Sequence, residues 1–219
     1  MKPVSRIAVI DYGMGNLRSV AQALRHVAGA RAEVLVTGDA QQIRDADKVV
    51  FPGVGAMRDC MRALDAQGLR EAVTNAAQEK PFLGICLGMQ ALFSHSEEGD
   101  VSGLGILPGR VRRFPESLQT EAVGGRLKVP HMGWNEVGMV TPHPLWAGIA
   151  DQSRFYFVHS YYVQPDDVRL MAGSTAYPFA FASAVARDNL FAVQFHPEKS
   201  QQAGLALLGN FVSWNGKMT

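Results

Sequence analysis

The sequence predicts an α/β fold: a three-layer open sheet, mostly parallel, with helices on both faces and an added antiparallel portion. In the first half, short apolar runs alternate with helical segments, which is typical of parallel strands joined by helices. The runs are apolar throughout, as in strands buried on both faces. In the second half, strand-like runs follow one another closely, and a hairpin turn at Asp188-Asn189 joins two of them.

The elements of the first half follow in order. Buried strands are predicted at the apolar runs 7–10, 33–36, 48–51 and 82–85. Helices are predicted over 17–27, 40–46, 57–64 and 69–78, and the first and third of these carry apolar residues at helical spacing. Cys60 falls on the apolar face of the third helix, where it has no evident chemistry.

The second half contains further strands and a closing helix. Strands are predicted over 109–113, 127–137, 154–162, 169–173, 179–187 and 190–195. The closing helix carries Leu205, Leu208 and Val212 on one face. Because no repeat, low-complexity linker or boundary interrupts the sequence, we expect a single domain over residues 1–219.

Composition and charge exclude several function classes. Lys+Arg 21 against Asp+Glu 20 gives a net charge of +1, which favours neither nucleic acid nor an anionic membrane as partner. Two cysteines are too few for a disulfide scaffold and lack the spacing of a zinc site. The amino-terminal residues run directly into a strand, and no segment has the length of a membrane span. We therefore expect a cytoplasmic protein without a metal or cofactor.

The run Gly84-Ile85-Cys86-Leu87-Gly88 is the strongest candidate for catalysis. It places Cys86 at a turn between a buried strand and a helix, with the Gly-x-nucleophile-x-Gly spacing of a nucleophile elbow. Amide N–H groups at the start of the helix would favour the thiolate. The alternative is a buried structural cysteine, which is common in proteins.

The second candidate is His196-Pro197-Glu198, at the end of a predicted strand. Residues two apart in an extended segment face the same side, so His196 and Glu198 can point into one site. Glu198 would accept a hydrogen bond from Nδ1 of His196 and leave Nε2 facing a thiol. The pair therefore suits a general base oriented by a carboxylate.

Acyl transfer also requires an oxyanion hole. One donor would be the backbone N–H of Leu87, directly after the nucleophile. A second could come from Gly53-Val54-Gly55, at the carboxyl end of a neighbouring strand, where ligand sites of open α/β sheets gather. A plain strand-to-helix turn is the alternative for this segment. The loop 11–16 could suggest dinucleotide binding, but Arg18 replaces the third glycine of that motif, so nucleotide binding is rejected.

These motifs resemble a known family. The run 84–90 together with 196–198 is similar to the triad class of glutamine amidotransferases. Asp11-Tyr12-Gly13-Met14-Gly15-Asn16, Pro52-Gly53-Val54-Gly55 and Pro130-His131-Met132-Gly133-Trp134-Asn135 narrow the resemblance to the glutaminase subunits of imidazole glycerol phosphate synthase, in histidine biosynthesis. The resemblance covers essentially the whole chain and implies one glutamine amidotransferase domain of the corresponding three-layer fold.

The resemblance implies a role for each motif residue. Cys86 would be the nucleophile, His196 the general base and then acid, and Glu198 the group that orients His196. The amides of Val54 and Leu87 would form the oxyanion hole. Substrate glutamine would lie against Gly53, Gln90, Glu98, Ser160 and Tyr161. A solvated charge in an acidic loop is the alternative for Glu98.

The resemblance also implies a partner. Glutamine would be hydrolysed through a cysteine thioester, and the ammonia would pass to a cyclase partner, which is a (β/α)8 barrel, within a heterodimer. That cyclase makes imidazole glycerol phosphate and an aminoimidazole carboxamide ribotide. The expected docking surface comprises large or polar residues near the site motifs, namely Asn16, Met132, Trp134, Tyr156 and Lys199. A core position is the alternative for Met132 and Trp134.

Two other functions fit parts of the sequence. The same triad serves other thiol amidohydrolases, including peptidases. A non-catalytic regulatory module could keep the fold, although the presence of Cys86, His196 and Glu198 disfavours it.

Overall fold

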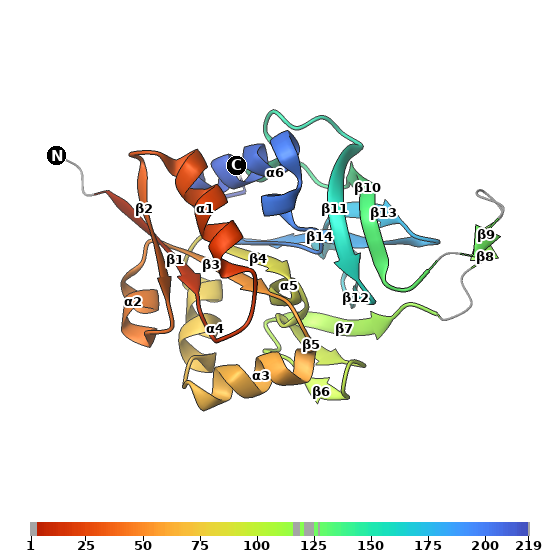
Figure 1. The fold of residues 1–219 in the computed structure, drawn as a ribbon, viewed down its shortest axis with the longest axis horizontal. Coiled ribbons are helices and arrows are strands. Elements are labelled where there is room, and N and C mark those ends of the chain that lie inside the picture. Colours follow the sequence, from red (N-terminus) through yellow and green to blue (C-terminus); the bar gives the residue numbers. More distant parts are fainter. Residues whose placement is uncertain (1–3, 116–118, 121–124, 127, 219) are drawn as a thin grey trace.

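The fold is organised around a large mixed sheet with helices on both faces, as the computed structural model shows (Figure 1). The structure describes residues 4–115, 119–120, 125–126 and 128–218. Along the sheet the strands follow the order β2-β1-β3-β4-β15-β14-β12-β7-β5-β6. The predicted fold class is confirmed.

The parallel half of the sheet is built from the first four strands of the chain and one late strand. These are β1 (Ser5–Ile10), β2 (Ala32–Thr37), β3 (Lys48–Gly53), β4 (Phe82–Cys86) and β15 (Leu190–Val193). Helices α1 (Leu17–Ala28) and α6 (Gln201–Ser213) cover one face (Figure 1). The other face is covered by α2 (Ala40–Asp45), α3 (Met57–Ala66) and α4 (Arg70–Glu79).

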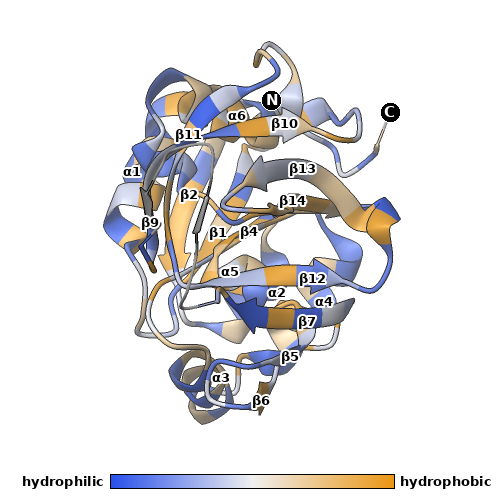
Figure 2. Ribbon diagram, turned by 90° about the vertical axis from the view of Figure 1, so that its right-hand side faces the viewer, coloured by the Kyte–Doolittle hydropathy of each residue, from blue (hydrophilic) through white to orange (hydrophobic). Residues whose placement is uncertain are grey.

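Alternation along the central strands divides the buried residues into two cores. In β1, Ile7 and Val9 pack into the core beneath α1 and α6, whereas Ala8 and Ile10 pack into the core beneath α2, α3 and α4. Figure 2 shows the resulting hydrophobic character of β1 and β4 inside the molecule. Cys60 is fully buried in the second core, on the face that the sequence predicts.

The antiparallel half extends the sheet beyond β15. It comprises β5 (Phe93–Ser96), β6 (Val101–Ser102), β7 (Leu107–Arg113), β10 (His131–Met139), β11 (Ser153–His159), β12 (Tyr161–Pro165), β13 (Met171–Ala176) and β14 (Ala180–Arg187). The predicted hairpin is confirmed, because β14 and β15 pair antiparallel around Asp188, which has a φ of 51°. The short strands β8 (Gln119–Thr120) and β9 (Gly125–Arg126) pair with each other.

The single strand predicted over 154–162 is wrong, because the chain forms two strands that separate at Ser160. Strand β11 pairs with β10, whereas β12 pairs with β7 and β14, so the chain must change partners between them. The carbonyl of Ser160 accepts a hydrogen bond from the N–H of Phe114, which holds this bend. The bend separates two residues expected at the substrate, Ser160 and Tyr161, from the strand before them.

Other boundaries also differ from the prediction. The strand expected at 169–173 begins as a 3-10 helix, η3 (Val168–Leu170), because the Asp167 side chain accepts from the N–H of Arg169. The strand expected at 127–137 begins at His131, and Leu127 lies outside the described residues. Helix α5 (Leu87–Gln90) is a single turn, and β5 and β6 were not predicted.

The closing helix α6 buries a somewhat different face from the predicted one. Leu208 and Val212 are buried as expected, but Leu205 is only half-buried and Leu207 and Phe211 take its place in the core. In the part of the chain that the structure describes, the helices are too short or too polar to cross a membrane.

Candidate active site

Cys86 stands at the junction of β4 and α5 in a conformation that few non-glycine residues adopt. Its φ of 55° and ψ of −110° produce the sharp turn of an elbow. A Cβ at Gly88 would lie 1.8 Å from the carbonyl oxygen of Phe51, and a Cβ at Gly84 would lie 3.0 Å from the Cβ of Ala192. Glycine is therefore required on both sides for the elbow to pack between β3 and β15.

His196 and Glu198 form a buried pair at the end of β15. Nδ1 of His196 lies 2.9 Å from Oε1 of Glu198, and the two side chains are 3% and 0% exposed. Pro197 begins the 3-10 helix η4 (Pro197–Lys199), which turns Glu198 back towards the imidazole. Because a carboxylate can only accept, Nδ1 donates, and Nε2 is left buried without a hydrogen-bond partner among the described residues.

The environment of His196 favours the imidazolium. Burial opposes a charge on the ring, but the neighbouring Cys86 and the hydrogen bond to Glu198 outweigh burial and raise the pKa of His196 to about 10. A protonated His196 beside Cys86 is the partner that a thiolate requires. The arrangement can therefore hold a thiolate–imidazolium pair.

A cleft of about 310 Å³ opens in front of Cys86 and His196. It is lined by Val54, Gly55, Cys86, Leu87, Gln90, Glu98, Pro130, Val158, His159, Ser160, Tyr161 and His196. The cleft thus brings together the predicted catalytic, oxyanion and substrate residues from both halves of the sheet. Gly53 does not line it; a Cβ there would lie 2.5 Å from Oη of Tyr12 and 2.9 Å from Cβ of Leu87.

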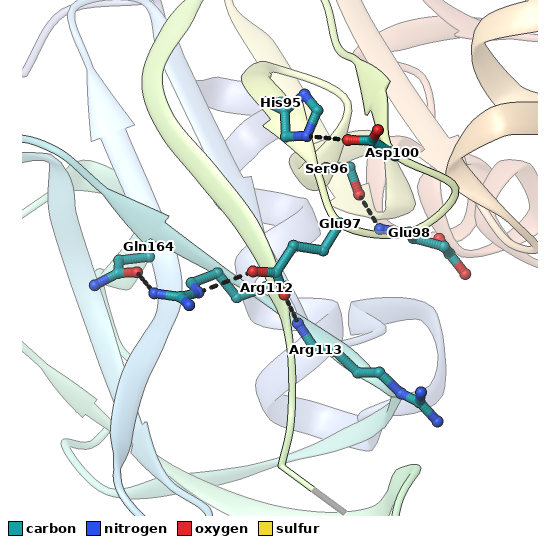
Figure 3. Close-up of polar contacts among 8 residues, drawn as sticks. All are labelled: His95, Ser96, Glu97, Glu98, Asp100, Arg112, Arg113 and Gln164. Carbon is teal, nitrogen blue, oxygen red and sulfur yellow. Dashed lines mark hydrogen bonds and ion pairs between the residues drawn. The ribbon is translucent and has the colours of Figure 1, made fainter.

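Glu98 is distinguished from the other acidic residues of its loop, as Figure 3 shows. Glu97 pairs with Arg112 and Asp100 with His95, whereas the carboxylate of Glu98 points away from both pairs. Its Oε2 accepts a hydrogen bond of 2.8 Å from the N–H of Met57, at the start of α3. Half-burial raises the pKa of Glu98, although that hydrogen bond opposes the shift. Glu98 is therefore a half-buried carboxylate at the cleft and not a freely solvated charge.

Two further side chains at the site were missed in the sequence. Gln194 is fully buried, and its Nε2 donates to the Cys86 sulfur at 3.6 Å. His159 lines the cleft just before the bend at Ser160. Gln194 stands two residues before His196, so its position in an extended segment was a signal that could have been used. The sequence offered no comparable signal for His159, because its place depends on the pairing of β11 with β10.

The residues expected at a docking surface lie beside the cleft, and two of them are exposed apolar side chains. Met132 is 61% exposed and Trp134 is 37% exposed, so a core position is wrong for both. The rings of Trp134 and Tyr156 meet edge to face at 6.1 Å, and Nζ of Lys199 lies 5.8 Å from the Tyr156 ring centre. Asn16 lies near Val54 and Glu198. We call these five residues the docking surface.

The sequence matches a family model and many relatives. The model named glutamine amidotransferase class-I matches residues 8–213. The imidazole glycerol phosphate synthase subunit HisH of Thiobacillus denitrificans is 65% identical over 95% of this chain and 91% of its own length. The protein of the same name from Nitrosospira multiformis is 64% identical over 95% of this chain and 97% of its own length.

Solved structures show the same fold at low sequence identity. The structure of PurLQS from Thermotoga maritima superposes with a TM-score of 0.70 at 16% identity and covers 96% of this chain and 99% of that chain. A GMP synthase protein from Thermoplasma acidophilum gives 0.68 at 21% identity, covering 97% of this chain and 94% of that chain. Family model, relatives and fold agree: the chain belongs to the class-I glutamine amidotransferases and, within them, to the HisH subunits of imidazole glycerol phosphate synthase.

Proposed function

We propose that this chain hydrolyses glutamine to glutamate and ammonia as the glutaminase component of an imidazole glycerol phosphate synthase, with Cys86 as the nucleophile. The observation that carries the assignment of residues is the arrangement at the elbow. Cys86 has a φ of 55° at the mouth of a cleft, next to a buried imidazole whose Nε2 has no hydrogen-bond partner among the described residues. A buried nitrogen without a partner is costly unless a reacting group uses it.

In the first half-reaction, the Cys86 thiolate attacks the side-chain amide carbon of glutamine and forms a tetrahedral intermediate. The backbone N–H groups of Val54 and Leu87 are the proposed donors to its oxyanion, and both residues line the cleft. His196, held by Glu198, then gives its proton to the amide nitrogen. The carbon–nitrogen bond breaks, ammonia leaves, and a thioester to Cys86 remains.

In the second half-reaction, water replaces ammonia. His196 takes a proton from the water, the resulting hydroxide attacks the thioester, and the same two amides stabilise the oxyanion. The carbon–sulfur bond then breaks, which releases glutamate and restores the thiolate and the imidazolium. Glu198 orients the ring and supports its charge throughout, as the 2.9 Å contact allows.

The remaining cleft residues are proposed to hold the amino-acid end of glutamine. Glu98 is half-buried at the cleft and suits the α-ammonium group of the substrate. Ser160 and Tyr161 follow the bend between β11 and β12 and line the same cleft, where they can meet the substrate's other polar groups. Gln90 is buried and fixes the carbonyl of Tyr161, and Gly53 leaves the space that Tyr12 and Leu87 occupy.

The partner is proposed to be the cyclase, which is a (β/α)8 barrel, bound as a heterodimer over the docking surface. The relatives are named as subunits of a synthase, which supports a complex. Ammonia released into water at neutral pH would be protonated and lose its nucleophilicity, so transfer to the partner must be enclosed. We further propose that residues 1–219 form a single amidotransferase domain that works in the cytoplasm, where the Cys86 thiol stays reduced.

The test replaces the nucleophile and compares two nitrogen sources. In the complex with the cyclase, Cys86→Ala should abolish glutamine-dependent synthesis and leave synthesis from ammonium salts intact, because free ammonia requires no thioester. Cys60→Ala is the matched control, since Cys60 is buried in the core away from the cleft; it should retain both activities. Normal glutamine hydrolysis by Cys86→Ala would contradict the proposal. Turnover of peptides in preference to glutamine would favour a peptidase.

A further inference from the structure

A continuous run of hydrogen bonds connects strand β10 with the Cys86 sulfur through side chains that the mechanism above leaves without a chemical role. His131 of β10 and His159 of β11 stand directly opposite each other in the antiparallel ladder. Both rings are buried, and Nδ1 of His131 lies 3.0 Å from Nε2 of His159. His159 lines the cleft, whereas His131 does not.

The contact of His159 with the backbone determines its tautomer. Nδ1 of His159 lies 2.7 Å from the carbonyl oxygen of Tyr161, which can only accept, so Nδ1 carries the proton. In a neutral imidazole, Nε2 is then an acceptor. It must receive its hydrogen bond from Nδ1–H of His131. Burial lowers the pKa of His159 to about 3, which keeps this ring neutral.

The same reasoning continues outward to Asn135. Burial lowers the pKa of His131 to about 4, so this ring is neutral and its Nε2 is an acceptor. Nδ2 of Asn135 lies 3.2 Å from that nitrogen. Nδ2 also donates to the carbonyl of Ala176, while Oδ1 accepts from the N–H of Glu136. These two backbone groups fix the orientation of the Asn135 amide, and every contact fits one set of tautomers.

Inward from Tyr161, the run reaches the sulfur through two amides. The Tyr161 carbonyl accepts a second hydrogen bond, of 3.0 Å, from Nε2 of Gln90. The same Nε2 donates to Oε1 of Gln194 at 3.0 Å. With its oxygen held by Gln90, Gln194 presents its Nε2–H to the Cys86 sulfur at 3.6 Å. The reverse orientation would place an amide oxygen against a thiolate and two N–H groups against each other.

We propose that Gln194 stabilises the Cys86 thiolate by donating a hydrogen bond to it, and that the neutral His131–His159 pair is the positioning device that holds this donor in place. Gln194 contacts the reacting atom and is a catalytic residue in this sense. His131 acts only through others, because Asn135, His159, the Tyr161 carbonyl and Gln90 lie around or beyond it in the run. The titratable groups coupled electrostatically to Cys86 are His196 and Tyr12.

The inference rests on the proposed role of Cys86 as nucleophile, so its test measures the sulfur without glutamine. The rate of alkylation by iodoacetamide is followed against pH on the full chain. Mass spectrometry of peptides then separates label on Cys86 from label on Cys60. If Cys86 were not an activated nucleophile, the wild-type chain would lack alkylation at low pH and the proposed function would fail. If only this inference were wrong, the wild type would keep that reactivity and the variants would match it.

The first variant removes the donor and keeps the length of the side chain. Gln194→Met should shift the alkylation profile of Cys86 upward by about one pH unit, because a thiolate that loses a hydrogen bond forms less readily. At a fixed pH below the transition, this corresponds to a rate about tenfold lower. Gln164→Met makes the same chemical change on β12, outside the run, and should leave the profile in place. Coincident profiles for Gln194→Met and the wild type would overturn the role of Gln194.

The second pair of variants separates positioning from stability. His131→Leu removes the donor to His159 and should shift the profile in the same direction by a smaller amount. His143→Leu is the matched control, because His143 is another buried histidine of lowered pKa but packs against Phe191 and Trp214, outside the run. His131→Asn keeps a donor where Nδ1 stood and should restore the profile in part. Equal shifts for His131→Leu and His143→Leu would overturn the positioning role.

A measurement on the unmodified chain remains decisive if a variant fails to fold. Long-range proton–nitrogen NMR assigns the tautomer of each histidine ring. His131 and His159 should both carry their proton on Nδ1 and stay neutral at pH 6, in line with the directions of their hydrogen bonds. A proton on Nε2 of either ring would overturn the run of hydrogen bonds from which the inference is drawn.

Discussion

At the scale of single residues, the neighbours of a histidine decide its charge in this molecule. His196 is buried, yet Cys86 and the carboxylate of Glu198 outweigh burial and raise its pKa to about 10. His143 and His131 are also buried but have no such neighbour, and burial lowers the pKa of each to about 4. One residue type therefore supplies a proton carrier at the site and neutral hydrogen-bonding rings elsewhere.

His196 and Glu198 should differ in how much catalysis they carry. His196→Ala removes the proton shuttle and should lower kcat by about 10³-fold or more. Glu198→Gln keeps a hydrogen-bonding group beside the ring and should cost about a hundredfold less. Steady-state kinetics in the complex with the cyclase measures both, with KM for glutamine expected to change little. A larger loss for Glu198→Gln than for His196→Ala would contradict the assigned roles.

His143 should make the folded state sensitive to acid. Its pKa is about 4 when folded and near 6.5 when unfolded, so between these values the unfolded chain binds a proton that the folded chain does not. Its contribution to the free energy of unfolding is complete above pH 6.5 and decreases towards pH 4, by about 1.4 kcal/mol per pH unit. Urea unfolding at several pH values should give a shallower pH slope for His143→Phe than for the wild type. Identical slopes would contradict the prediction.

At the scale of elements, the packing of α6 against η4 holds the catalytic pair. A Cβ at Gly204 of α6 would lie 1.9 Å from the carbonyl oxygen of Pro197, so α6 approaches η4 more closely than any other residue at this position would allow. Ser200, between the two helices, accepts from the N–H of Tyr156 and donates to the carbonyl of His196. The position of His196 therefore depends on a helix packed behind it.

Two alanine substitutions in α6 should have opposite effects. Gly204→Ala must displace η4, and should cost about 1–3 kcal/mol of stability and much of the glutaminase activity. A Cβ at Gly209 would meet only the Cβ of Val27, at 3.9 Å, so Gly209→Ala should stabilise the chain by about 0.5–1 kcal/mol without loss of activity. Urea unfolding and kinetics measure both variants. Unchanged activity in Gly204→Ala would show that the packing does not hold the pair.

At the scale of the whole molecule, the cleft lies where the two halves of the sheet meet. The parallel half supplies Cys86 and the segment with Val54, and the antiparallel half supplies Ser160 and Tyr161. Ligand sites of open α/β sheets gather at the carboxyl ends of the parallel strands, and the cleft follows this rule. The docking surface lies beside it on β10, β11 and η4, so a partner bound there would lie next to the cleft.

The docking surface should carry the affinity for the cyclase. Trp134→Ala should weaken binding by about thirtyfold, since an exposed Trp packed on Tyr156 is a typical interface anchor. Lys199→Ala should have a smaller effect, because charges at the rim contribute less. Titration calorimetry measures affinity, and circular dichroism verifies the fold of each variant alone. Val168→Ala is the control, as Val168 is 73% exposed outside this surface. Equal affinity for all variants would move the interface elsewhere.

Much of the site could be predicted from the sequence because its signals are local. Glycines two residues before and after Cys86 are required by the elbow itself, and the spacing of His196 and Glu198 places both side chains within reach of each other. The alternation of apolar strands and helices likewise predicted the parallel half of the sheet, since periodicity follows from which face each residue buries.

The tertiary structure alone decided how segments distant in the sequence meet. The bend at Ser160 arises because β11 and β12 pair with different strands, and nothing in the run 154–162 encodes that exchange. His131 and His159 become partners only through the register of β10 with β11. The orientation of Gln194 depends on Gln90, which comes from another part of the chain. Strand register and side-chain orientation depend on the sum of many long-range contacts, so a local pattern determines the elements but not the neighbours that give them their chemistry.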